Sequence, residues 1–137
     1  MIRILVVDDV EAVRMGIVVL LDSIPGVMVV GTCEDGSDAA AAAAALSPDV
    51  VLMDVRMPRL DGVAAASAVL ARSPAVRVIM LSSSIDRGAA HRARRAGAAG
   101  YLLKSDDPEH LVSAIVAAAA GEQWWSASVA ETLRHAE

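Results

Sequence analysis

The sequence has one cysteine and very few aromatic residues. Cys33 stands alone, so no internal disulfide can form, and a chain without disulfides suits a reducing compartment. Phenylalanine is absent, and the aromatic side chains are those of Tyr101, Trp124 and Trp125. Hydrophobic residues make up 55% of the chain, and alanine supplies many of them. The core is therefore expected to be aliphatic and closely packed.

A basic excess and long apolar runs are also missing. The net charge of -5 argues against a nucleic-acid-binding surface on this chain, because such surfaces normally carry an excess of Lys and Arg. No apolar run approaches the roughly 18 residues of a membrane span, and the first residues lack the pattern of a signal peptide. A length of 137 residues fits one domain. We expect a cytoplasmic domain without membrane contact.

Short apolar runs alternate regularly with helix-length segments. The runs are rich in β-branched residues and near-continuously apolar, as is typical of strands buried on both faces of a parallel sheet, and lie at 2–7, 27–32, 50–54, 77–81 and 100–103. Helix signals stand between them, such as Pro108 in the first turn of the fifth helix. Five such units predict an α/β fold, a five-stranded parallel sheet with helices on both faces. Residues 126–133 are expected to begin a sixth helix.

Polar residues stand at the ends of four predicted strands, where sheets of this class bind ligands. Asp8 and Asp9 follow the first strand, Asp54 closes the third, and Ser82 and Lys104 follow the fourth and fifth. We assume the common flavodoxin-like strand order 2-1-3-4-5. The fourth strand then lies about 5 Å from the third, so the short Ser82 side chain can reach a group bound to Asp54. The fifth strand lies about 10 Å from the third, and only a side chain as long as that of Lys104 spans that distance.

Simpler explanations account for each residue singly. An aspartate can cap a helix, which would explain one of Asp8 and Asp9, but not both together with Asp54. A lone lysine is usually a solvated cation, yet Lys104 is the only lysine beside eleven arginines. Clustered carboxylates raise one another's pKa unless a cation is present, and oxygen ligands alone favour Mg²⁺ over zinc. The pattern predicts a Mg²⁺ site and acyl phosphate formation, with a carboxylate as the nucleophile.

Three other classes of phosphate chemistry lack their motifs. The stretch "DDVEAV" after the first strand contains no G-x-G-x-x-G, so a dinucleotide-binding domain is excluded. A P-loop needs glycine directly before its lysine, where this chain has Leu103. A phosphatase with an aspartate nucleophile usually carries a second acid two residues later, where this chain has Arg56.

At these residues the sequence resembles the receiver domains of bacterial two-component response regulators. The stretches "ILVVDDVEAVR", "DVVLMDVRMPRLDG", "VIMLSSS" and "AGAAGYLLKSDDPEHLVSAI" follow the family's order and spacing over residues 2–121. The resemblance implies that a histidine kinase phosphorylates Asp54, and that the domain is a switch which promotes its own phosphorylation and dephosphorylation rather than a turnover enzyme. It implies Mg²⁺ ligands at Asp9, Asp54 and the Arg56 backbone carbonyl, with Asp8 acting through water. Lys104 would contact the phosphoryl group, and Ser82 and Tyr101 would change position on activation.

The details resemble the NarL/LuxR type, in which a helix-turn-helix domain follows the receiver. "RMPRLDG", "GYLLKS" and "AAAAGEQWWSASVAETL" carry that likeness. We therefore expect a receiver at 1–121, then a linker or the start of a sixth helix at 122–137, with the DNA-binding output domain absent from this chain. The resemblance implies transcriptional regulation and a possible homodimer on phosphorylation. A stand-alone phosphorelay or interaction module and a non-phosphorylated pseudo-receiver remain alternatives.

Three further features stay open at this point. Ser82 stands where threonine is commoner in receiver domains. The serine hydroxyl should keep the hydrogen bond to a group bound on Asp54, but the smaller side chain should loosen the switch. The four arginines of 87–95 form either a solvated helix face or part of a signalling surface. Trp124 and Trp125 are expected to pack against the end of the fifth helix, with a dimer or linker contact as the alternative.

Overall fold

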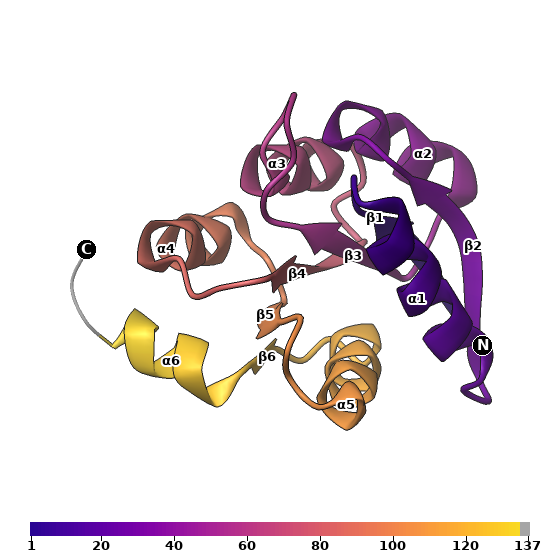
Figure 1. Cartoon of the computed structure of the whole chain (residues 1–137). Coiled ribbons are helices and arrows are strands. Elements are labelled where there is room, and N and C mark those ends of the chain that lie inside the picture. The colour runs from indigo at the N-terminus through magenta and orange to yellow at the C-terminus, as the bar shows by residue number, and fades with distance from the viewer. Residues whose placement is uncertain (135–137) are drawn as a thin grey trace.

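The computed structural model describes residues 1–134, which form alternating strands and helices (Figure 1). The elements in chain order are β1 (Ile2–Val7), α1 (Glu11–Asp22), β2 (Val27–Cys33), the 3₁₀ turn η1 (Gly36–Asp38), α2 (Ala39–Leu46), β3 (Val50–Asp54), α3 (Gly62–Arg72), β4 (Arg77–Ser82), α4 (Arg87–Ala96), β5 (Gly100–Leu103), α5 (Pro108–Ala119), β6 (Trp124–Trp125) and α6 (Ala127–Leu133). The end of the predicted C-terminal segment, residues 135–137, lies outside the described residues. Within residues 1–134, no helix is both long and apolar enough to cross a membrane.

The sheet is parallel throughout, with the order β2-β1-β3-β4-β5-β6. Helices α2, α3, α4 and α6 pack on one face, and α1 and α5 on the other (Figure 1). The near-continuous apolar runs explain this arrangement, since alternate residues of one strand enter opposite cores. In β3, Val51 and Met53 enter one core and Val50 and Leu52 the other. The order 2-1-3-4-5 and the two helical layers are confirmed.

The prediction of five strands is wrong, because β6 adds a sixth at the edge of β5. Its two residues, Trp124 and Trp125, pair with Gly100 and Tyr101. A two-residue strand is too short to show an apolar run, and edge pairing with β5 defines it. The tryptophans also divide between the two cores: Trp124 packs in the core of α1 and α5, as expected, whereas Trp125 packs in the opposite core.

The loops beyond β3 and β4 are fixed by helix caps that begin the next helices. The Asp61 carboxylate accepts hydrogen bonds from the backbone N–H groups of Val63 and Ala64, at 2.9 and 3.1 Å, and so begins α3. Gly62 is required there, because a Cβ atom at this position would collide with the Asp54 carbonyl group. Asp86 caps α4 through the Ala89 N–H group at 3.0 Å. The loop before α3 therefore runs close to the end of β3.

Candidate functional site

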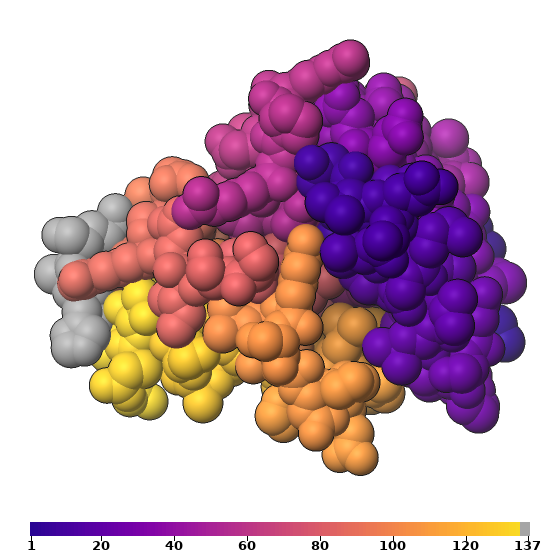
Figure 2. All heavy atoms as spheres, in the orientation of Figure 1, coloured from indigo at the N-terminus to yellow at the C-terminus, as the bar shows by residue number. Residues whose placement is uncertain are grey.

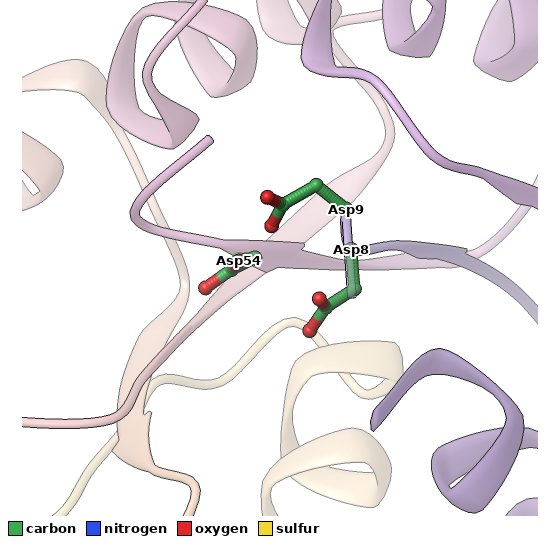
Figure 3. A group of neighbouring side chains, drawn as sticks. All are labelled: Asp8, Asp9 and Asp54. Carbon is green, nitrogen blue, oxygen red and sulfur yellow. The ribbon is translucent and has the colours of Figure 1, made fainter. Parts of the chain in front are cut away.

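Three carboxylates meet where β1 and β3 end side by side in the sheet. Carboxylate oxygens of Asp8, Asp9 and Asp54 all lie within 4.8 Å of one another. Figure 3 shows the three side chains converging at the ends of the two strands. Asp8 and Asp54 are buried, with 1% and 5% exposure, and Asp9 is half-buried. The predicted cluster is thus brought together by the neighbouring positions of β1 and β3.

The helix-cap explanation for the first two aspartates fails. The N-cap of α1 is Val10, which has no side-chain cap hydrogen bond. The Asp8 Oδ1 atom instead accepts a hydrogen bond from the Val10 N–H group at 2.9 Å, and the Asp8 carbonyl accepts one from Arg14 at 2.8 Å. These bonds fix the turn after β1, which leaves Asp8 Oδ2 facing the cluster.

Lys104 reaches the cluster from two strands away. Its Nζ atom lies 2.9 Å from Asp8 Oδ2 and 3.1 Å from Asp54 Oδ1. The Lys104 N–H group donates to the Ser82 carbonyl at 2.7 Å, and Asp106 Oδ2 accepts from the Leu103 N–H group at 2.9 Å, so the turn after β5 is fixed on both sides. In the space-filling view the orange segment around β5 and α5 lies against the indigo N-terminal segment (Figure 2). Lys104 is therefore an ordered ion-pair partner rather than a solvated cation.

The charges of the cluster perturb two pKa values. Burial, and then the negative charge of Asp8, raise the pKa of Asp54 to about 6, although Lys104 opposes this rise. Burial lowers the pKa of Lys104, but Asp8 and Asp54 outweigh that effect and the net shift is upward. Three carboxylates thus face one ammonium group, and a divalent cation would neutralise the excess negative charge.

The donor set fits Mg²⁺. Three carboxylates offer the hard oxygen ligands that Mg²⁺ prefers, and the remaining positions can be filled by water and a backbone carbonyl. A cavity of about 310 Å³, lined by Asp9, Glu34, Asp35, Asp38, Pro58 and Arg59, opens beside Asp9 and gives access to this side of the cluster.

Ser82 and Tyr101 stand behind the cluster. Ser82 is 1% exposed at the end of β4, and its hydroxyl donates to the Ser84 carbonyl at 2.6 Å rather than pointing at Asp54. Tyr101 is fully buried, and burial raises the pKa of its phenol, with the Ser82 hydroxyl opposing this. Within the described residues the Tyr101 Oη atom makes no hydrogen bond of standard geometry.

Arg56 shows a contact that the sequence analysis missed. Its guanidinium lies 3.2 Å from Asp86 Oδ2, so the loop after β3 is joined to the first turn of α4. The sequence pattern predicts a fourth helix over residues 86–96, whereas α4 begins at Arg87 and Asp86 is its N-cap. The pairing of Asp86 with Arg56 depends on tertiary structure. The ion pair is mostly exposed on the arginine side and stabilises the fold weakly.

Comparisons with known proteins agree on one family. The family described as "Response regulator receiver domain" matches residues 4–116. The transcriptional regulatory protein LiaR of Bacillus subtilis is 39% identical over 98% of this chain, and the response regulator GacA of Pseudomonas aeruginosa is 40% identical over 97%. The chain spans about two thirds of the length of these relatives, 66% of LiaR and 62% of GacA.

Solved structures give the same result. A LuxR-family two-component response regulator from Aurantimonas sp. superposes with a TM-score of 0.91 at 34% identity, covering 96% of this chain and 94% of that chain. The signal receiver domain of NarL from Mycobacterium tuberculosis superposes with a TM-score of 0.83 at 36% identity, covering 88% and 98%. The chain therefore belongs to the response regulator receiver domain family and resembles its NarL/LuxR members.

Proposed function

We propose that this receiver domain accepts a phosphoryl group on Asp54 from a sensor histidine kinase. The observation that carries the proposal is the position of the Asp54 carboxylate, which lies in ion-pair contact with Lys104 and beside two further carboxylates at the end of β3. Transfer forms a bond between an Asp54 carboxylate oxygen and phosphorus and breaks the bond between phosphorus and the kinase histidine nitrogen. The released imidazole takes up a proton.

Asp9, Asp54 and the Arg56 backbone carbonyl are the proposed direct ligands of Mg²⁺, and Asp8 acts through water. When bound, Mg²⁺ supplies positive charge to the transferring phosphoryl oxygens. Lys104 supplies a second positive charge, because its Nζ atom already lies 3.1 Å from Asp54 Oδ1. The same groups serve phosphorylation and dephosphorylation of the chain itself, so we assign a switch rather than a turnover enzyme.

The proposed switch residues are Ser82 and Tyr101. The Ser82 hydroxyl now bonds to the Ser84 carbonyl, and a phosphoryl oxygen on Asp54 would be a stronger, charged acceptor. Turning toward it frees the Ser84 carbonyl and moves the loop before α4. Tyr101 occupies the space behind Ser82, so its position responds to that movement.

The role in the whole protein follows from the relatives. LiaR is named a transcriptional regulatory protein and extends beyond the region matched here. We propose that this receiver likewise controls transcription in the cytoplasm through a helix-turn-helix domain outside this chain, with a homodimer forming on phosphorylation. A stand-alone receiver and a non-phosphorylated pseudo-receiver are the alternatives.

Acetyl phosphate with Mg²⁺ is expected to add one phosphoryl group to the wild-type chain and none to Asp54→Asn. The amide keeps the shape of the side chain but removes its nucleophilic oxygen. Intact mass spectrometry measures the labelling, and Asp22→Asn, at an exposed aspartate of α1, is the matched control. Equal labelling of wild type and Asp54→Asn would refute the assignment. No labelling of either would favour the pseudo-receiver.

Arg56→Asn is expected to shorten the lifetime of the phosphorylated state several-fold. Arg56 stands two residues after Asp54 and pairs with Asp86 at the start of α4, and we propose that its side chain shields the phosphoryl group from water. The decay of phosphorylated protein after removal of acetyl phosphate gives the rate. Arg72→Asn, at an exposed arginine at the end of α3, should decay like wild type. An unchanged rate in Arg56→Asn would contradict the shielding role.

A further inference from the structure

The strand β6 is hydrogen-bonded directly to the switch residue Tyr101. The Trp124 N–H group donates to the Ala99 carbonyl at 2.9 Å, and the Ser126 N–H group donates to the Tyr101 carbonyl at 3.0 Å. Gly100 allows this pairing, because a Cβ atom there would collide with the Trp124 carbonyl oxygen. The chain after α5 is therefore fixed along the backbone that carries Tyr101.

Helix α6, which follows β6, packs against α4 on the same side of the sheet. Val129 of α6 is completely buried, and Trp125 packs against the same core, which also contains Tyr101. The apolar side chains that α4 contributes to this core are small, at Ala89, Ala90 and Ala93, and the one larger buried side chain of this helix is that of His91. In Figure 2 the yellow C-terminal segment lies against the salmon α4 region. Large side chains from β5, β6 and α6 thus fill the space under α4.

Tyr101 is buried in the core to which this packing belongs. Its hydroxyl is buried without a hydrogen bond of standard geometry among the described residues, and a buried unsatisfied hydroxyl costs free energy. Apolar contact must offset that cost, and Trp125, which pairs with Tyr101 between β5 and β6, packs against the same core as Tyr101 and Val129. Undocking α6 would open this core to water and let the Tyr101 hydroxyl turn outward.

We propose that the β6–α6 segment (residues 124–133) is an intramolecular effector of the switch, whose docking on α4 and β5 favours phosphorylation of Asp54. The inference rests on the proposed function. In this proposal, docked α6 keeps Tyr101 in the space behind Ser82. The Ser82 hydroxyl donates to the Ser84 carbonyl, so it turns toward a phosphoryl oxygen only when the loop before α4 moves with it. Coupling between two sites is reciprocal, so phosphorylation must in turn strengthen docking of α6. The region after α6 would then receive the signal through this helix.

The two tryptophans give a direct readout in the wild-type chain, since both lie in β6. In a Trp124→Phe background, Trp125 is the only remaining tryptophan. Beryllofluoride with Mg²⁺ should move its emission to shorter wavelength, as the docked population grows, and should slow amide hydrogen exchange in α6. Unchanged emission and exchange in protein carrying beryllofluoride would overturn the inference. A shift to longer wavelength with faster exchange would overturn it too, because phosphorylation would then release α6.

Val129→Asp tests the reverse direction. Burying a carboxylate under α4 should undock α6 and weaken beryllofluoride binding at least about fivefold, the lower end of typical allosteric coupling. Ala127→Asp places the same charge at an exposed position of α6 and should bind like wild type. Val129→Ser, a milder change, should weaken binding in the same direction by less, which guards against loss of folding. Equal binding by Val129→Asp and Ala127→Asp would overturn the proposal.

These outcomes separate the two proposals. If acetyl phosphate labels Asp54 but the fluorescence, exchange and affinity measurements show no link to α6, the proposed function stands and this inference falls. If wild-type protein binds no beryllofluoride and accepts no phosphoryl group, both fall together.

Discussion

Lys104→Met is expected to slow phosphorylation of Asp54 by acetyl phosphate by about 10²- to 10³-fold, the loss typical of removing one preorganised donor. Methionine keeps an unbranched side chain of similar length but removes the ammonium that contacts both Asp8 and Asp54. The variant loses positive charge beside the transferring group and leaves the two buried carboxylates without a cation. A time course of intact mass at saturating Mg²⁺ measures the rate.

Two further variants define what Lys104 supplies. Lys104→Arg keeps the charge but replaces a compact point charge by a planar fork, so an intermediate rate is expected. Arg72→Met removes an exposed cation at the end of α3, far along the chain from the cluster, and should leave the rate unchanged. A wild-type rate in Lys104→Met at saturating Mg²⁺ would show that the ammonium takes no part in transfer.

The sequence was sufficient to predict the composition of the cluster. In a parallel sheet the residues after successive strands meet at one edge, so Asp8, Asp9 and Asp54 could be placed together once the strand order was assumed. The length of Lys104 matched its place two strands from β3, since its Nζ atom contacts Asp54, whereas the reach of Ser82 to a group bound on Asp54 stays a prediction. This reasoning worked because it used only strand spacing and the apolar runs, which are local and strong signals.

The features that the sequence did not predict depend on contacts between distant segments. The strand β6 exists because Trp124 and Trp125 find the open edge of β5, and because Gly100 has no side chain to block them. The Ser82 hydroxyl donates to the Ser84 backbone carbonyl in a loop, and the residue types in that loop do not predict this hydrogen bond.

Repulsion among the clustered carboxylates is expected to lower the free energy of unfolding at neutral pH. Two buried carboxylates and a third beside them share one ammonium, and folding brings these charges together. Such a cost is common where a site is built for binding rather than for stability. The same carboxylates therefore influence both the affinity for a metal ion and the free energy of unfolding.

Without divalent cations, the free energy of unfolding is expected to fall as the pH rises from about 4 to 7, and Asp54→Asn should lose much less. The pKa of Asp54 is about 6 in the folded chain, against an ordinary value of 3.8. Between pH 3.8 and 6 the folded state holds a proton on Asp54 that the unfolded state has released. The contribution of Asp54 to the free energy of unfolding is therefore fully present below pH 3.8 and is lost as the pH rises through 6. Because the pKa of Lys104 is raised, this group loses its proton only at alkaline pH, and its contribution to stability is constant between about pH 4 and 7.

At about 1.4 kcal/mol per pKa unit, the shift corresponds to an upper limit of about 3 kcal/mol, so Asp54→Asn should be about 1–3 kcal/mol more stable than wild type at pH 7.5. Urea unfolding in EDTA at pH 4.5 and 7.5 measures the difference, and the exposed Asp22→Asn should follow wild type. Added Mg²⁺ should stabilise wild type more than Asp54→Asn, because it binds the folded cluster. Parallel pH profiles for wild type and Asp54→Asn would show that Asp54 is not the strained carboxylate.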